Sequence, residues 1–158
     1  MSRFNEWQPP EIIEGQDSRW GWRVSHVDGL KLGQRVDIGY GCYIQAQRGV
    51  TIEDDVQLGA HCVIYSVNTI DGVWGPVIIK RGVCIGAHSV IFPGVIIGEG
   101  AKIGAMSLVK HDVPAGELWY GIPAKRGRVY RVRPNGEASH SSGRLRFDRE
   151  GDRPSVQE

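Results

Sequence analysis

Two histidines occupy equivalent positions in neighbouring repeats of this sequence. His61 and His88 each follow an aliphatic residue, Leu58 and Ile85, by three places. We expect both histidines in the second strand of consecutive coils with their side chains outward, and stacked strands about 4.8 Å apart would make the imidazoles neighbours. Histidine exchanges protons near neutral pH and can be the base that acyl transfer to an amine or hydroxyl requires. We interpret His61 as the candidate base and His88 as a ligand-side residue, with a purely structural His88 as the alternative.

Further polar candidates lie where the spacing of the repeat is broken. Residues 66–76 (SVNTIDGVWGP) must leave the coil as a loop, and two extra residues form a bulge at 47–49 one coil earlier. Insertions in a solenoid map to its working surface. Asp71 is also explained as a turn former before glycine, and Arg48 either binds a phosphate or is a solvated surface residue. The candidate substrate-binding residues are Gln47, Arg48, Asn68, Asp71, Trp74 and His88.

These residues are positioned by an internal repeat of six residues between Leu32 and Val109. An α-helix repeats its apolar face every 3.6 residues and a plain strand every two, so neither gives this period. A parallel β-helix does, because three short strands of about six residues make one triangular coil and the inward aliphatic residues stack into a core. The repeating residues are Leu32, Ile38, Ile44, Ile52, Leu58, Ile64, Ile70, Ile79, Ile85, Ile91, Ile97, Ile103 and Val109.

The repeat divides the chain into four parts. Residues 1–29, with Trp7, Trp20 and Trp22, do not obey it and are predicted to cap the open first coil. Residues 30–115 form an all-β helix of about four coils, and residues 116–133 form a C-terminal cap with a basic segment. Residues 134–158 have few apolar side chains and are predicted to be a disordered tail.

Composition excludes several classes of protein. The chain has 158 residues, 41% hydrophobic content and a net charge of +1, which suits one globular domain. It has no apolar run of membrane-spanning length and no signal-peptide pattern at its start, so we expect a cytoplasmic protein. No aromatic platform accompanies the basic residues, which argues against nucleic-acid binding. Cys42 and Cys62 fall in the column of small residues and are interpreted as wall residues.

The run from Pro76 to Arg128 (PVIIKRGVCIGAHSVIFPGVIIGEGAKIGAMSLVKHDVPAGELWYGIPAKRGR) resembles the hexapeptide-repeat acyltransferases, which fold as left-handed parallel β-helices. The similarity is to sugar O-acetyltransferases and to N-acetyltransferases of nucleotide-linked amino sugars. It implies a homotrimer with acetyl-CoA between neighbouring β-helices. The O-acetyltransferases place their base histidine in the loop, where this chain has Thr69. The polar residue that positions the amine in some amino-sugar relatives corresponds to Ser66, with Asn68 close by.

The resemblance also implies a cofactor site. Small side chains at Ala87 and Ala105 would allow the pantetheine arm of acetyl-CoA to approach the backbone. Lys110, Lys125 and Arg128 would meet its phosphates near the C-terminal end. No metal is implied.

The sequence therefore predicts an acetyl-CoA-dependent N-acetyltransferase that acts on a nucleotide-linked amino deoxysugar in surface-polysaccharide biosynthesis, with His61 and Ser66 as catalytic residues. The alternative is a sugar O-acetyltransferase with His61 as base. Two remoter alternatives are a γ-carbonic anhydrase-like protein and a non-catalytic trimeric scaffold. The first would need zinc ligands at Tyr65, Ala87 and Phe92, and these residues are not a zinc ligand set.

Overall fold

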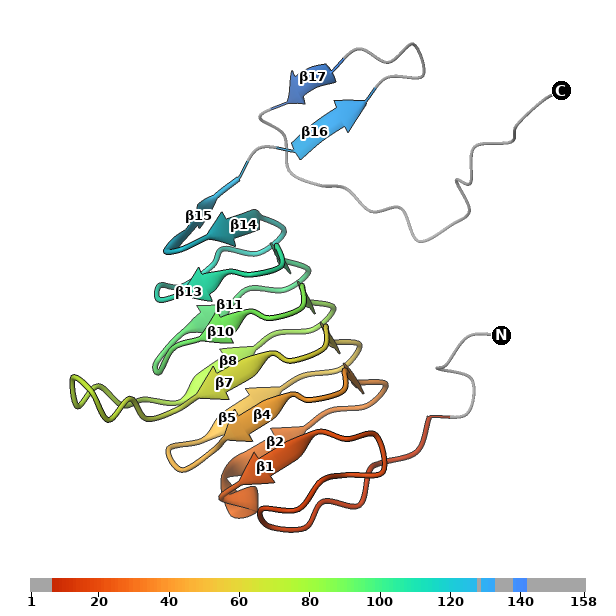
Figure 1. The fold of residues 1–158 in the computed structure, drawn as a ribbon. Helices are drawn as coiled ribbons and strands as arrows, with labels where there is room; N and C mark the ends of the chain where they lie inside the picture. The colour runs from red at the N-terminus through yellow and green to blue at the C-terminus, as the bar shows by residue number, and fades with distance from the viewer. Residues whose placement is uncertain (1–6, 128, 133–137, 142–158) are drawn as a thin grey trace, which may run out of the picture.

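The computed structural model describes residues 7–127, 129–132 and 138–141 of the chain. The chain winds into a parallel β-solenoid whose coils are stacked along one axis (Figure 1), and each coil gives one short strand to each of three sheets. The parallel β-helix predicted from the repeat is thereby confirmed. With five strands in its longest all-parallel sheet, the solenoid has about five coils rather than four.

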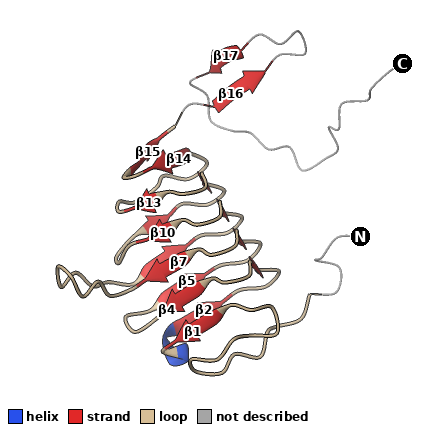
Figure 2. Cartoon of the chain, in the orientation of Figure 1, coloured by secondary structure: helices blue, strands red, loops and turns tan. Residues whose placement is uncertain are grey.

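The strands are as follows. Sheet A contains β1 (Arg23–Ser25), β4 (Tyr43–Gln45), β7 (Val63–Tyr65), β10 (Val90–Ile91) and β13 (Leu108–Val109). Sheet B contains β2 (Leu30–Leu32), β5 (Val50–Ile52), β8 (Val77–Ile79) and β11 (Ile96–Ile97). Sheet C contains β3 (Asp37–Ile38), β6 (Gln57–Leu58), β9 (Cys84–Ile85), β12 (Lys102–Ile103), β14 (Leu118–Gly121) and, antiparallel to β14, β15 (Ala124–Arg126). A 3-10 turn, η1 (Val27–Gly29), lies at the N-terminal end of the stack (Figure 2), and β16 (Val129–Val132) pairs with β17 (Ala138–Ser141).

The core is the predicted column of aliphatic side chains. Residues such as Ile44, Ile64 and Ile91 are fully buried, and the parallel register places them directly above one another. Leu32 is only partly buried because it lies near the open end of the solenoid. Ile70 is the exception, since 94% of its surface is exposed. Assigning Ile70 to the repeat was wrong, because it belongs to the inserted loop.

The strands are shorter than the six residues expected. Most contain two or three residues, and the remaining residues of each repeat turn the corner to the next sheet. At two of the three corners one residue per coil adopts a left-handed conformation with positive φ. His61 (φ 58°) and His88 (φ 60°) occupy such positions between sheets C and A, so placing them within strands was wrong.

The N-terminal segment both begins the solenoid and covers its end. β1 already pairs in parallel with β4, inside the region predicted as a cap. Trp22 is 3% exposed, and the indole of Trp7 donates a hydrogen bond to the Val36 carbonyl (3.1 Å). Trp20, in contrast, is 44% exposed, with the Arg19 guanidinium over its ring at 4.8 Å.

Cys42 and Cys62 lie in the wall of the solenoid, as the sequence predicts. Cys42 and Cys62 are buried, and their thiols donate hydrogen bonds to the carbonyls of Gly59 (3.1 Å) and Gly86 (3.2 Å). Ser89 occupies the same column and donates to the next carbonyl in the same way. A hydrogen bond between the two sulfurs, together with burial, raises the pKa of the Cys42 thiol and keeps it protonated. The same hydrogen bond lowers the pKa of Cys62 to about 7.

Among the described residues, no helix is long and apolar enough to span a membrane. The tail predicted to be disordered, 134–158, lies outside the described residues except for β17.

Candidate active site

The corner between sheets C and A carries the histidines. We call this the histidine corner, and its left-handed positions are Gly41, His61, His88 and Met106. These residues are far apart in sequence but lie in one column, because the backbone amide at each corner donates a hydrogen bond to a backbone carbonyl of the coil below. The His61 amide, for example, donates to the Tyr40 carbonyl (2.8 Å). The column runs parallel to the solenoid axis and is exposed at both histidines.

The two imidazoles are stacked. Their ring centroids are 5.0 Å apart with an interplanar angle of 14°. The prediction that the imidazoles of His61 and His88 are neighbours is therefore confirmed. On its other side His61 meets the ring of Tyr40 edge-on, with centroids 5.7 Å apart and an angle of 86°. Aromatic rings favour such edge-to-face contacts. His61 is therefore held between two rings while its surface stays open to solvent.

Glycine makes room for these rings. A Cβ atom on Gly41 would overlap Nδ1 of His61, and a Cβ on Gly21 would overlap the ring of Tyr40. Both glycines also have positive φ, 72° and 75°, which other residues rarely adopt. The repeat pattern does not single out Gly21, Gly41 or Tyr40, although a glycine one coil below each ring was a usable signal.

The inserted loop projects from the opposite edge of sheet A (Figure 1), at the corner between sheets A and B. Val67 and Trp74 form an antiparallel bridge, and the amide of Asn68 donates to the carbonyl of Val73 (2.7 Å), so the loop is a short hairpin. The carboxylate of Asp71 accepts the amide of Val73 (3.2 Å), which supports its interpretation as a turn former.

Arg48 and Trp74 form a contact at the base of this hairpin. The Arg48 guanidinium lies 4.8 Å from the centroid of the Trp74 ring, a cation–π distance, and 63% of Trp74 is exposed. The flat guanidinium keeps N–H donors at its edge, so stacking leaves Arg48 able to bind an anion. Gln47 is exposed beside it, and its side-chain oxygen accepts a hydrogen bond from the Gln45 amide (3.1 Å).

Ser66 lies inside the protein rather than on its surface. Its side chain is 0% exposed, and its hydroxyl donates to the backbone and side-chain oxygens of Gln45 and accepts the amide of Arg48. These bonds tie the hairpin base to the bulge of the preceding coil. The hydroxyl is therefore not presented to a substrate, and we do not retain Ser66 as a catalytic residue.

The predicted cofactor residues fall in three places. Ala87 and Ala105 directly precede His88 and Met106 at the histidine corner. Lys110 lies across sheet A, over the ring of Phe92 at 5.4 Å, and Lys125 is exposed on β15 at the C-terminal end of sheet C. Arg128 lies outside the described residues. The described part of the chain contains no group of three or more His, Cys, Asp or Glu side chains that could hold a metal ion.

Sheet A separates the histidine corner from the hairpin. An extended chain advances about 3.3 Å per residue, so the strand from His61 to Ser66 spans roughly 15 Å. The outward row between the two edges is largely apolar and contains Tyr43, Val63, Val90 and Leu108, which the parallel register aligns. Within one chain, therefore, His61 and the hairpin residues cannot contact the same substrate atom.

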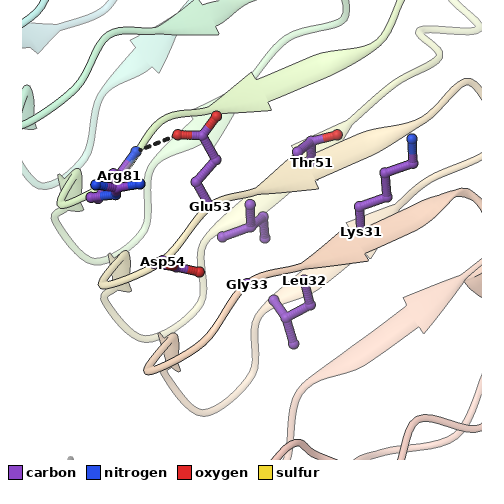
Figure 3. Close-up of a pocket in the computed structure, with 8 residues that line it drawn as sticks. Lys31, Leu32, Gly33, Thr51, Glu53, Asp54 and Arg81 are labelled. Atoms are coloured by element: carbon purple, nitrogen blue, oxygen red, sulfur yellow. Dashed lines mark hydrogen bonds between the residues drawn. The ribbon is translucent and has the colours of Figure 1, made fainter.

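A hollow of about 340 Å³ lies elsewhere, on sheet B (Figure 3). Its carboxylates are already engaged: Glu53 bonds to Lys80 Nζ (3.0 Å) and the Arg81 amide (2.9 Å), and Asp54 accepts the Gln34 amide (2.8 Å). The hollow is not lined by any of the candidate residues, and we do not assign it to the site.

Comparison with known proteins agrees with the fold. The family model for the hexapeptide repeat of succinyl-transferase matches residues 49–73 and 76–105. A dTDP-3-amino-3,6-dideoxy-alpha-D-galactopyranose 3-N-acetyltransferase of Aneurinibacillus thermoaerophilus is 52% identical over 52 residues, which are 33% of this chain and 27% of that protein. The chain spans at most 60% of the length of three curated relatives that it matches.

Two solved structures are also similar. A hexapeptide-repeat acetyltransferase of Vibrio cholerae, in complex with acetyl-CoA, superposes with a TM-score of 0.63 at 26% identity over 66% of this chain and 62% of that chain. A maltose O-acetyltransferase of Clostridium difficile gives a TM-score of 0.63 at 28% identity over 67% of this chain and 62% of that chain.

Proposed function

Because this chain is a hexapeptide-repeat protein with acetyltransferases among its relatives, we propose that it transfers the acetyl group of acetyl-CoA to an amino group. We propose as acceptor a nucleotide-linked amino deoxysugar of surface-polysaccharide biosynthesis, with the reaction in the cytoplasm. The observation that carries the proposal is the exposed imidazole pair of His61 and His88, in a repeat fold whose similar structures include one with acetyl-CoA bound.

The acceptor class is supported by two features of the chain. A 52-residue segment is 52% identical to an N-acetyltransferase of a dTDP-linked amino sugar. The hairpin has no histidine, and Thr69 stands where the resemblance would place one. A neutral amine is already a nucleophile, so its acylation depends less on a base than acylation of a hydroxyl does.

The step transfers one acyl group and one proton. The amine nitrogen attacks the thioester carbonyl carbon, the C–N bond forms and the C–S bond breaks. His61 accepts the proton that the attacking nitrogen loses, and that proton returns to the departing sulfur to give free CoA. No other reactant is needed. Tyr40 and His88 hold the His61 ring so that one edge faces the substrate.

We propose that two copies of the chain, within a homotrimer, complete each site. His61 and the hairpin lie on opposite edges of sheet A, and the apolar outward row between them suits burial against a neighbour. The hairpin of one copy, with Asn68 and Trp74, would then reach the histidine corner of the next. Arg48, stacked on Trp74, would bind the diphosphate of the nucleotide.

We propose that acetyl-CoA binds at the same corner. Ala87 and Ala105 leave the backbone accessible beside the histidines, as a narrow pantetheine arm requires. Lys125 at the C-terminal end would meet the CoA phosphates, with Arg128 as a further phosphate candidate. Lys110 lies on the other edge of sheet A from the histidine corner. It would therefore contact a CoA molecule bound at the histidine corner of a neighbouring copy.

O-acetylation of a sugar hydroxyl is the second candidate. It is favoured by the exposure of His61 and by similarity to a maltose O-acetyltransferase structure. A hydroxyl must lose its proton as it attacks, so this reaction would depend fully on His61.

An acceptor panel tests the proposal. Release of CoA from acetyl-CoA is measured with dTDP- and UDP-linked amino sugars, the corresponding hydroxy sugars and maltose. We expect turnover with amino sugar nucleotides and little with hydroxyl acceptors. Turnover with hydroxyl acceptors alone would establish the second candidate, and failure of the wild-type chain to bind acetyl-CoA in calorimetry would overturn both.

A further inference from the structure

A track of small side chains runs beside the histidine corner and ends at an aromatic ring. The residue just before the left-handed position is Ala60, Ala87 or Ala105 in three successive coils, and Tyr40 in the coil below them. The corner amides of the next coils donate to the carbonyls of Tyr40, Ala60 and Ala87 at 2.8–2.9 Å, which places these residues in one column. The column therefore changes from methyl groups to a bulky ring at the level just below His61.

The ring of Tyr40 is held in place although 68% of it is exposed. It covers Gly21, where a Cβ atom would overlap its Cδ2 and Cε2 atoms, and its edge meets the imidazole of His61. Gly21 belongs to the N-terminal segment, outside the residues that the repeat family matches. The ring thus closes the track from the first coil of the repeat and packs on Gly21 of the N-terminal segment.

We propose that Tyr40 limits the length of the acyl chain that the enzyme transfers, an inference that rests on the proposed acetyl transfer at His61. The basic residue Lys125 lies at the C-terminal end of the solenoid, so a CoA bound along Ala87 and Ala105 has its phosphates there and its thioester at His61. The acyl tail, on the far side of the carbonyl from sulfur, then points toward the N-terminal coils. The first side chain it meets is Tyr40.

The dimensions suit a short acyl group. Adjacent coils are about 4.8 Å apart, so the space between the His61 level and the Tyr40 level holds a methyl group but not an extended alkyl chain. Each methylene group that an apolar pocket accepts or excludes changes the ratio of kcat/KM values between two acyl donors by about 10-fold to 200-fold. Tyr40 would therefore admit acetyl and exclude butyryl or longer chains.

The test compares acyl donors. kcat/KM is measured for acetyl-, butyryl- and hexanoyl-CoA with the wild-type protein, Tyr40→Ala and Tyr40→Phe. We expect Tyr40→Ala to raise the butyryl-to-acetyl ratio at least about tenfold, and Tyr40→Phe, which keeps the ring, to retain the wild-type ratio.

A second pair of variants tests the position of the Tyr40 ring without changing Tyr40 itself. Gly21→Ala would displace the ring and should raise the same ratio. Gly15→Ala is the matched control, because Gly15 has a similar φ of 67° but nothing within 4 Å of its added Cβ. Both variants carry comparable backbone strain, so only a shift in Gly21→Ala that is absent in Gly15→Ala supports the inference.

Two results would overturn the inference. One is a wild-type protein that uses butyryl-CoA as well as acetyl-CoA, and the other is an unchanged ratio in Tyr40→Ala, including an equal loss with all donors. The ratio of Kd values for the same acyl-CoAs, measured by calorimetry, gives an answer without turnover. Absence of acetyl-CoA binding would overturn the proposed function itself, whereas binding with an unchanged Kd ratio would overturn only the role of Tyr40.

Discussion

Two corners of the solenoid use the same backbone conformation with different side chains. The corner between sheets B and C, here the charged corner, has its left-handed positions at Arg35, Asp55, Gly82, Gly100 and Gly116. Three are glycines, and the other two form an ion pair in which Arg35 Nε donates to Asp55 Oδ1 at 2.7 Å. At the histidine corner the left-handed positions are Gly41 and three residues with side chains, His61, His88 and Met106.

This difference is why we propose that the histidine corner carries the function and that the charged corner is structural. A side chain in the left-handed region costs about 1–2 kcal/mol per residue relative to glycine. At the charged corner glycine avoids that cost or an ion pair offsets part of it. At the histidine corner Gly41 avoids that cost, stacking of the His61 and His88 rings offsets part of it, and both rings remain exposed. Strain kept where glycine would serve is a reason to infer function.

The largest expected effect comes from His61→Gly. Glycine is favoured at this φ, so the variant should fold with unchanged stability or gain up to about 1 kcal/mol. Loss of a general base lowers the rate by about 10²-fold to 10⁴-fold. We expect kcat to fall at least about 100-fold in the CoA-release assay. A loss below about tenfold, or a large loss of stability, would place His61 with the structural residues.

A smaller effect on activity is expected from Gly41→Ala, with Gly82→Ala as its counterpart at the charged corner. Both glycines have positive φ, so each substitution should lower the free energy of unfolding by about 1–2 kcal/mol. Only the Cβ at position 41 would displace His61, whereas position 82 has open space. We expect kcat to fall about tenfold in Gly41→Ala alone, because misplaced catalytic groups lose rate. Equal activities in the two variants would contradict the distinction between the corners.

At the charged corner we expect a pH-dependent contribution to stability from Glu53, which directly follows β5 where the chain turns from sheet B to sheet C. The hydrogen bond and ion pair with Lys80, together with the Arg81 amide, lower the pKa of Glu53 below its ordinary value of 4.5. The stability from Glu53 is therefore fully present above pH 4.5 and is lost as pH falls through the lower folded-state pKa. Glu53→Gln should be less stable than wild type at pH 7, and the difference should shrink in acid, as followed by urea unfolding. A difference that is independent of pH would refute this assignment.

The smallest effect is expected inside the histidine corner. Cys42→Ser and Cys62→Ser keep a donor for the carbonyls of Gly59 and Gly86, as Ser89 does in the same column. We expect each substitution to change the free energy of unfolding by less than about 1 kcal/mol and to leave acetyl transfer unaltered. Loss of activity in Cys62→Ser would mean that the thiol has a chemical role.

The sequence predicts the repeating core well and the site only in part. A period of six places Ile44, Ile64 and Ile91 inward because burial itself imposes the repeat. It also predicts the neighbourhood of His61 and His88, but not that both lie in corner turns. A period of six does not show which residues of each repeat lie in the strand and which turn the corner.

The interrupted segments are predicted less well. Ile70 matches the period but is exposed, because a period does not reveal whether a segment has left the coil. Ser66 resembles a site residue in sequence but is buried, since its hydroxyl bonds to the neighbouring coil. The contacts of Tyr40 with Gly21 and His61 join parts of the chain whose spacing carries no periodic signal.

The central claim is that the histidine corner of one copy reacts together with the hairpin of another. It is tested most directly by the activity of an assembly that contains equal amounts of two inactive chains. One chain is His61→Gly, and the other has residues 68–73 replaced by Asn-Gly, which joins Val67 to Trp74 by a two-residue turn.

If each site takes its histidine from one copy and its hairpin from another, random mixing restores about a quarter of the wild-type rate, because one pairing in four is intact. We predict that recovery in co-expressed or co-refolded mixtures. A mixture that stays as inactive as its two components would contradict the account.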